Sequence, residues 1–132
     1  MVVASTTVRE IMSTELVTVD PTATLTETAR VMFAGRAGSA LVLRDGTLVG
    51  IFTERDILRA LGDSSSADLA RVSPVSKWMS EDPETIGPET LIGEALDRML
   101  FGGFRHLPVM DGEAVVGMVS MRDLARIMAH PS

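Results

Sequence analysis

Apolar positions form helical stripes and short runs that occur twice along this chain. Leu25, Ala29, Met32 and Phe33 recur at steps of three and four residues, which predicts a helix with one core-facing stripe that ends at Gly35. The second copy carries the same stripe before a pair of glycines, and its members are Leu91, Ala95, Leu96, Met99 and Leu100. Each stripe therefore predicts one helix per copy.

Strand signals surround each predicted helix. A short extended stretch that ends in proline precedes it, at 16–21 and at 84–88. Two apolar runs around an Asp-Gly turn follow it, ALVL and TLVGIF in the first copy and LPVM and EAVVGMV in the second. A further amphipathic stretch closes each copy, and Gly62 is the expected end of the first of these. Each copy predicts the order β-α-β-β-α.

The two copies are related by a shift of 67 residues. Residues 8–61 and 75–128 share 14 identities in 54 aligned positions, where composition alone would give roughly three. The segment 62–74 is rich in Gly, Ser and Asp, which predicts a connector, with a helical turn at 67–72. One copy buries too little surface to fold alone. We expect a single α/β domain over 1–132, with the two repeats packed about a pseudo-two-fold axis.

Composition excludes several partners. The net charge of −6, with four Phe and one Trp, offers neither a basic field nor a stacking surface for nucleic acid. No stretch approaches the 18 or more apolar residues of a membrane span, and the N-terminus lacks the features of a secretory signal. We expect a cytoplasmic protein without nucleic-acid or membrane partners.

Catalytic and metal-binding patterns are absent from the sequence. The chain has no cysteine, and its two histidines have no acidic pair at ligand spacing. It also lacks a G-x-S-x-G elbow, a G-x-G-x-x-G loop and a Walker loop. We expect no enzyme, no metal and no required cofactor.

The octapeptides VGIFTERD and VGMVSMRD are the most informative part of the repeat. In the first, Thr53 stands three residues before Asp56, where a strand gives way to a helix. In the second, Ser120 and Asp123 have the same spacing. A hydroxyl residue followed by an acid at this distance is typical of a helix cap, which requires no ligand.

Three features favour a ligand instead. The acid is Asp both times, although Glu reaches back to a cap more easily. A cation, Arg55 or Arg122, precedes it at a helix N-terminus, where the helix dipole disfavours positive charge. Gly50 and Gly117 interrupt apolar strands, which indicates a close approach to the backbone. Free N–H groups, a hydroxyl, an arginine and a carboxylate together suit a phosphorylated ribose.

At these residues the sequence resembles the cystathionine-β-synthase (CBS) domain family, specifically a tandem CBS pair or Bateman module. The resemblance extends from Val8 to Met128. It is carried by the motifs VREIMSTELVTVDPTATL, LVGIFTERDIL, VSKWMSEDPETIGPETL, FRHLPVMDG and VVGMVSMRDL.

This resemblance implies two clefts between the repeats, which bind AMP, ADP, ATP or S-adenosylmethionine in many members. The family pattern places the hydroxyl residue and the Asp of each octapeptide on phosphate or ribose. It also places the start of the second strand at the base pocket, which corresponds here to Ser39, Ala40, Arg105, His106 and Pro108. Because the first copy reads GSALV where the second reads RHLPV, the two clefts are expected to differ.

Two functions follow from these patterns. The first is a regulatory module that senses an adenine nucleotide or adenosyl ligand and acts on a target protein in trans. The second is an interaction scaffold with the same fold and no physiological nucleotide. Both predict a homodimer, because so short and apolar a chain leaves apolar helix faces exposed as a monomer.

Overall fold

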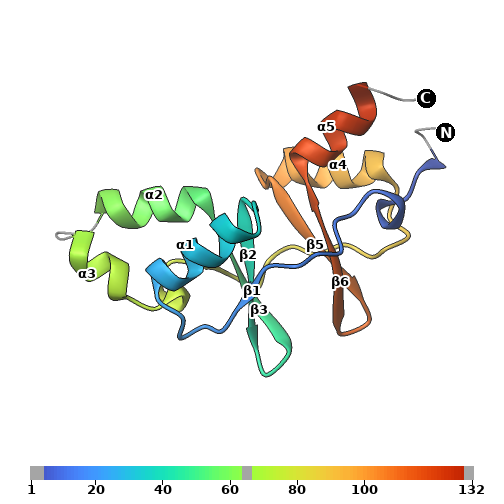
Figure 1. The fold of residues 1–132 in the computed structure, drawn as a ribbon. Helices are drawn as coiled ribbons and strands as arrows, with labels where there is room; N and C mark the ends of the chain where they lie inside the picture. Colours follow the sequence, from blue (N-terminus) through green and yellow to red (C-terminus); the bar gives the residue numbers. More distant parts are fainter. Residues whose placement is uncertain (1–4, 64–66, 130–132) are drawn as a thin grey trace. The chain divides into compact units, whose positions relative to one another are not determined.

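A computed structural model describes residues 5–63 and 67–129 of the chain (Figure 1). The chain divides into two compact units. The N-terminal unit is Val17–Pro83, and the C-terminal unit is Glu84–Ser132 together with Met1–Leu16. The predicted mixed α/β fold made of two repeats is confirmed by the element order.

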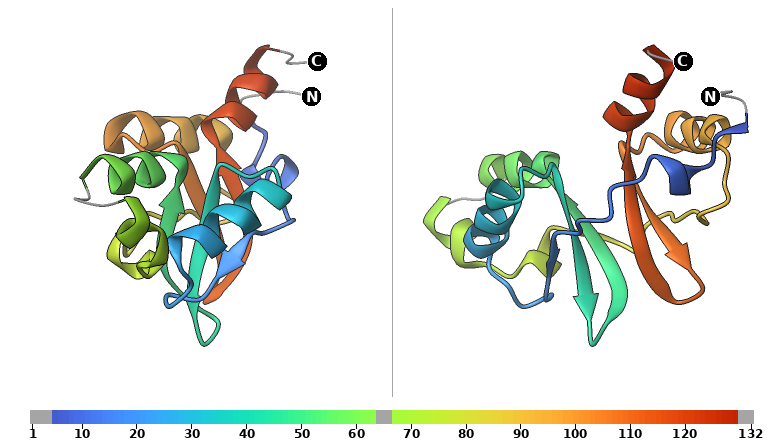
Figure 2. Two further views of the ribbon diagram at one scale, coloured as in Figure 1. Left: turned by 60° about the vertical axis from the view of Figure 1, so that its left-hand side comes forward. Right: turned by 45° about the vertical axis from the view of Figure 1, so that its right-hand side comes forward.

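Among its described residues, the N-terminal unit contains one four-stranded sheet, three α-helices and one 3-10 helix. Its sheet has the order β1-β2-β3-β4, in which β1 is parallel to β2 and the other pairs are antiparallel. Helices α1 and α2 lie on the same side of the β2–β3 hairpin (Figure 2). The elements are β1 (Thr18–Val19), α1 (Leu25–Ala34), β2 (Ser39–Arg44), β3 (Thr47–Thr53), α2 (Glu54–Asp63), α3 (Ala67–Val72), the 3-10 helix η3 (Val75–Lys77) and β4 (Ser80–Glu81).

The C-terminal unit repeats this plan with fewer regular strands. Its elements are the 3-10 helix η2 (Val8–Glu10), α4 (Ile92–Gly102), β5 (His106–Asp111), β6 (Ala114–Ser120) and α5 (Met121–Ala129). Single bridges replace the two short strands, since Ile86 pairs with Val109 in parallel and Ser13 pairs with Met118 antiparallel. The second copy of the extended stretch at 84–88 is therefore one bridge rather than a strand.

Both hairpins turn at equivalent positions. In the first, Asp45 and Gly46 have φ values of 50° and 81°, and positive φ at both positions is the pattern of a type I′ turn. In the second, the turn lies at Gly112 and Glu113, and only Gly112 has positive φ, at 64°. The prediction of an Asp-Gly turn is correct for the first hairpin and wrong for the second, because Asp111 is the last residue of β5 and pairs with Ala114.

Some of the glycines that were predicted as helix ends do end a helix. Helix α1 ends at the predicted Gly35, and α4 ends before Gly103, whose φ of 72° suits glycine. Helix α2 does not stop at Gly62 but continues to Asp63. The predicted helical turn at 67–72 is α3, while residues 64–66 of the connector lie outside the described residues.

The start of each family repeat packs into the unit formed by the other repeat. We call residues 7–13 and 74–81 the exchanged segments. In the N-terminal unit, the backbone N–H of Leu25 donates to Ser73 and that of Val75 donates to Ala23, at 3.0 and 2.7 Å. In the C-terminal unit, the equivalent bonds run from Ile92 to Thr6 and from Val8 to Thr90, at 3.0 and 2.8 Å.

Each unit has its own core, to which its exchanged segment contributes. Val75 and Trp78 are 0% and 6% exposed and join the core of the N-terminal unit. Val8, also 0% exposed, joins the core of the C-terminal unit. Most remaining core residues come from the helices and hairpin of each unit, including Met32, Val42 and Phe52 in the first and Met99, Val109 and Val119 in the second.

The strand glycines make room for methionines of the exchanged segments. A Cβ on Gly50 would clash with Sδ of Met79, and one on Gly117 would clash with Sδ of Met12. The same Cβ on Gly50 would also lie 3.0 Å from the carbonyl oxygen of Ser80. Packing within each unit therefore explains the two glycines. A ligand close to their backbone is not needed to explain them.

The substitution Gly50→Ala is expected to destabilise the protein by about 1–3 kcal/mol, because the added methyl overpacks against Met79. Urea unfolding followed by circular dichroism measures this loss. In a Met79→Ala background the loss should shrink but not vanish, since the contact with the Ser80 backbone remains. Gly87→Ala is the matched control, because a Cβ there meets nothing within 4 Å. An equal loss in both backgrounds would contradict this packing role.

Candidate functional site

The start of β2 and the end of β3 lie side by side in the N-terminal unit. Ser39 is the ladder partner of Thr53, and Ala40 is the partner of Phe52. Ser39 is buried and Thr53 is half-buried. The side chain of Ala40 belongs to the core, so only its backbone is available to a ligand. The two sequence-predicted parts of the first site are thus adjacent.

Asp56 lies in the first turn of α2 beside this ladder pair, and only 7% of its surface is exposed. Its Oδ2 accepts a hydrogen bond from the backbone N–H of Thr53 at 2.9 Å, and the Thr53 hydroxyl donates to the same oxygen at 3.3 Å. Its Oδ1 accepts from Arg59 Nη2 at 3.3 Å. Asp56 therefore has its carboxylate partnered on both oxygens.

Arg59 connects Asp56 to the exchanged segment. Its Nη2 donates to the backbone carbonyl oxygen of Trp78 at 2.6 Å. Its guanidinium also lies 5.7 Å from the centre of the Trp78 ring, and the ammonium of Lys77 lies 5.4 Å from it. Both distances fall within cation–π range. The carboxylate of the candidate site, an arginine and a buried tryptophan are thus linked by direct contacts.

The C-terminal unit places the second set of predicted residues in the same way. His106 is the ladder partner of Ser120, and Pro108 is the partner of Met118. His106 is half-buried and Pro108 is buried. Arg105 is exposed just before β5, and its carbonyl oxygen accepts from the N–H of Met121 at 2.8 Å.

At the second site, two reciprocal hydrogen bonds between Ser120 and Asp123 cap the N-terminus of α5. The N–H of Ser120 donates to Asp123 Oδ2 at 3.0 Å, and the N–H of Asp123 donates to the Ser120 hydroxyl oxygen at 3.1 Å. Arg126 lies 4.0 Å from Asp123 Oδ1, and the Asp123 side chain is 26% exposed against 10% for that of Asp56. The second site is therefore more open and its acid is held less tightly.

The helix-cap interpretation is confirmed at the second octapeptide, where the Ser120 hydroxyl accepts from the N–H of Asp123. At the first octapeptide the acid bonds back to the N–H of Thr53, and the Thr53 hydroxyl donates to that acid. The choice of Asp over the longer Glu does not argue for a ligand, because both carboxylates reach the backbone N–H three residues earlier. Arg55 and Arg122 are exposed beside these helix N-termini. Their side chains remain available for a phosphate, whereas the carboxylates already have a structural role.

Sequence reasoning missed Arg59 and Arg126. Each stands three residues after the acid of its octapeptide and forms an ion pair with it, at 3.3 and 4.0 Å. The sequence did contain a sign of their role, because Arg59 and Arg126 occupy the same position in the two repeats. A cation at i+3 from an acid on a helix is a contact that spacing alone predicts.

The shifted pKa values lie away from the candidate sites. Glu27 has its pKa lowered because the backbone N–H and the hydroxyl of Thr24 donate to its carboxylate in the cap of α1. Asp20 has its pKa lowered by equivalent hydrogen bonds from Thr22. Within residues 5–63 and 67–129, no three His, Cys, Asp or Glu side chains gather as a metal site would require. No helix in these same ranges has the length and apolarity to cross a membrane.

Two repeated α/β units, each with a hairpin whose end abuts a capped helix, define a tandem-repeat module. The CBS domain family matches residues 8–63 and 75–130, and the chain belongs to this family. An uncharacterized 17.7 kDa protein in the bps2 3′ region of Acidianus ambivalens is 40% identical over 94% of this chain and 74% of its own length. The CBS domain-containing protein YhcV of Bacillus subtilis is 33% identical over 89% of this chain and 82% of its own length.

Solved structures of CBS proteins share the fold. The CBS-domain protein ATU1752 of Agrobacterium tumefaciens has a TM-score of 0.86 at 27% identity, covering 93% of this chain and 99% of its own. The CBS domain pair of protein MJ0100, in complex with 5′-methylthioadenosine and S-adenosyl-L-methionine, has a TM-score of 0.86 at 22% identity, covering 96% and 98%. CBSX2 in complex with AMP has a TM-score of 0.79 at 21% identity, covering 95% and 97%.

Proposed function

We propose that this protein is a regulatory module that binds an adenine nucleotide or adenosyl ligand, works as a homodimer in the cytoplasm, and acts on a target protein in trans. The observation that carries the proposal is the ladder pairing of Ser39 with Thr53, next to the nearly buried Asp56. This pairing gathers residues from separate motifs at one helix N-terminus. Arg55, which is exposed beside this helix N-terminus, suits a phosphate.

The proposed ligand contacts differ between the two units. In the N-terminal unit, Thr53 and Asp56 would contact phosphate or ribose, with Arg55 on the phosphate and with Ser39 and Ala40 at the base. In the C-terminal unit, Ser120, Arg122 and Asp123 would take these roles, with Arg105, His106 and Pro108 at the base. The protein MJ0100 and CBSX2, which share the fold, hold adenosine-containing ligands, and this supports the ligand class.

A calorimetric and thermal-shift screen tests the proposal. The purified protein is titrated with AMP, ADP, ATP, NAD and S-adenosylmethionine, and a ligand at 100 times its dissociation constant should stabilise the fold by about 2.7 kcal/mol. The sole tryptophan, Trp78, contacts Arg59 and so gives a second readout by fluorescence. Absence of any stabilisation by these compounds at millimolar concentration would overturn the proposal.

The variant Asp56→Asn is expected to weaken ligand binding at the first site by about tenfold or more, because a charge-assisted hydrogen bond contributes about 1.5–3 kcal/mol. Calorimetry measures the affinity, and Asp123→Asn reports the second site. Glu27→Gln is the matched control, since Glu27 makes the same 2.9 Å cap bond on α1, away from the site. If Asp56→Asn lowers only the melting temperature, as Glu27→Gln should, then Asp56 is a cap alone.

A second candidate function is a dimeric interaction scaffold without a physiological nucleotide. The observation that favours it is the occupation of both Asp56 oxygens and of Asp123 Oδ2 by hydrogen bonds within the protein. A stable dimer that binds none of the compounds in the screen would support this function.

A further inference from the structure

Arg59 joins two parts of the N-terminal unit through a single nitrogen atom. Its Nη2 donates to Asp56 Oδ1 at 3.3 Å and to the carbonyl oxygen of Trp78 at 2.6 Å. Asp56 lies at the candidate ligand site, whereas Trp78 belongs to the exchanged segment 74–81. A nearly buried carboxylate needs charged or hydrogen-bonding partners. Asp56 Oδ1 receives such a partner from a side chain that is itself bonded to the exchanged segment.

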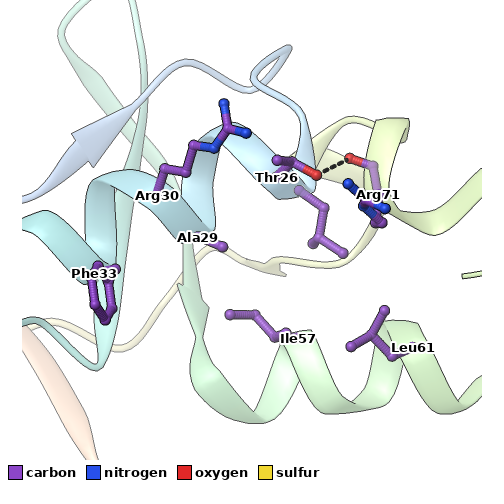
Figure 3. A pocket seen from close by; sticks show the side chains of 8 residues that line it. Thr26, Ala29, Arg30, Phe33, Ile57, Leu61 and Arg71 are labelled. Carbon is purple, nitrogen blue, oxygen red and sulfur yellow. Dashed lines mark hydrogen bonds between the residues drawn. The ribbon is translucent and has the colours of Figure 1, made fainter. Parts of the chain in front are cut away.

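Trp78 is in turn fixed to helix α3. Its indole N–H donates to the Ser73 hydroxyl at 2.9 Å, and that hydroxyl donates to the carbonyl oxygen of Ala70 at 2.6 Å. Helix α3 is tied to α1, because the Thr26 hydroxyl donates to the carbonyl oxygen of Arg71 at 3.1 Å (Figure 3). The carbonyl group that accepts the bond from the arginine therefore belongs to a buried residue that is anchored through α3.

The C-terminal unit does not repeat this bridge. Arg126 occupies the position of Arg59 in the second repeat, but it lies 4.0 Å from Asp123 Oδ1. Ile11 occupies the position of Trp78, and its side chain has neither a ring nor an N–H group. In the part of the chain that the structure describes, Arg126 forms no hydrogen bond with Ile11. The bridge from the acid to the exchanged segment therefore distinguishes the first site from the second.

From this difference between the units, we infer that Arg59 is a positioning residue that couples the first ligand site to the exchanged segment 74–81. The inference rests on the proposed function, because it assigns Asp56 to a ligand. Arg59 holds the carboxylate of Asp56 in place only while the exchanged segment is packed in the unit. A ligand that binds the positioned carboxylate therefore favours the packed segment, and by linkage a loosened segment weakens the ligand.

The exchanged segment connects this coupling to the second repeat. Residues 75–130 form the second family repeat, so the segment is where that repeat begins. The chain then passes from Pro83 into the C-terminal unit at Glu84. In this scheme, occupancy of the first site sets how firmly the start of the second repeat is held. The second site has no such bridge and does not act on its own exchanged segment in this way.

Hydrogen exchange of the ligand-free protein tests the bridge directly. The backbone N–H groups of Val75 and Ser76 donate to carbonyl oxygens of the loop before α1, at 2.7 and 3.2 Å, so they report whether the segment is packed. The Arg59 side chain is 53% exposed, which screens its bonds. Arg59→Gln should therefore speed the exchange of these two groups by about two- to fivefold.

Two controls separate the bridge from a general loss of stability. N–H groups within β2 and β3 are the internal reference, because a general loss of stability would speed their exchange as well. Arg126→Gln is the matched variant in the other unit and should leave the exchange of Val75 and Ser76 unchanged. In an Asp56→Asn background the effect of Arg59→Gln should shrink, because the carboxylate is already gone. Unchanged exchange of Val75 and Ser76 in Arg59→Gln would overturn the bridge.

The fluorescence of Trp78 tests the coupling with AMP and S-adenosylmethionine as the probes. The guanidinium of Arg59 lies 5.7 Å from the centre of the Trp78 ring, so a probe that acts on this contact should change the emission. In Arg59→Gln, calorimetry should show binding at the first site weakened by about two- to fivefold, while the emission change is lost. Arg126→Gln should keep the emission change. Arg59→Lys retains the charge on a shorter side chain and should show a reduced change.

Failure of the coupling is distinguishable from failure of the proposed function. If neither probe binds the wild-type chain, the adenosine ligand and the coupling that rests on it are both overturned, whatever the exchange of the ligand-free protein shows. If a probe binds Arg59→Gln with wild-type affinity and the full emission change, only the coupling is overturned. Tighter binding by Arg59→Gln would mean that Arg59 competes with the ligand for Asp56, which also overturns the positioning role.

Discussion

A fragment spanning residues 17–83 is expected to fold cooperatively, whereas a fragment of the same length spanning residues 8–74 is expected to remain unfolded. The first contains a complete compact unit, including Val75, Trp78 and β4. The second contains the whole first family repeat but lacks these core residues. Removal of each large core side chain costs about 2–5 kcal/mol, and a small domain has only about 5 kcal/mol to lose.

Thermal melting followed by circular dichroism separates the two fragments. The 17–83 fragment should show a single cooperative transition, and the 8–74 fragment should show a low-helicity signal without one. Adding a peptide of residues 75–83 in excess to the 8–74 fragment should restore part of the helical signal, because it supplies the missing exchanged segment. Equal, cooperative melting of both fragments would contradict the role of that segment.

Trp78→Ala is expected to destabilise the full chain by about 3–5 kcal/mol, because it empties a large part of the N-terminal core. The substitution also removes the 2.9 Å hydrogen bond that the indole N–H donates to the Ser73 hydroxyl. Trp78→Phe keeps most of the apolar bulk and loses that bond, so a loss of about 1–2 kcal/mol is expected. Urea unfolding must be followed by circular dichroism, since Trp78 is the only tryptophan.

The control for this effect is the equivalent residue of the other exchanged segment. Ile11 stands where Trp78 stands in the second repeat, and it is half-buried. Ile11→Ala should therefore cost only about 1–2 kcal/mol. A loss at Ile11 as large as that at Trp78 would mean that the two cores depend equally on their exchanged segments.

Periodicity predicted the local elements well, because each depends on neighbours in sequence. The stripe that ends at Gly35 and the hairpin around Asp45 and Gly46 are set by side-chain spacing and by φ preference. The shift of 67 residues likewise placed equivalent residues in equivalent positions, as the ladder pairs of Ser39 with Thr53 and His106 with Ser120 show.

Contacts between distant segments were not predictable in this way. Hydrophobic periodicity does not reveal the exchange of residues 7–13 and 74–81, because the pattern of apolar residues in these segments suits either unit. The reason for Gly50 was therefore misjudged, because Met79 comes from an exchanged segment. The contact of Arg59 with Trp78 was missed for the same reason, because Trp78 also belongs to an exchanged segment and lies 19 residues away in the chain. Which segment fills a space is decided by packing, and spacing alone does not contain that information.

The exchange also orders the folding of the chain during synthesis. The N-terminal unit pairs residues no farther apart than 17 and 83, so it is complete once Pro83 has been made. The C-terminal unit needs Val8 to bond with Thr90 and Ser13 to pair with Met118, and both contacts join residues far apart in the chain. Closing such a long loop is slow. The exchanged segment 7–13 is thus made before the rest of its unit but can pack only after that unit has been made.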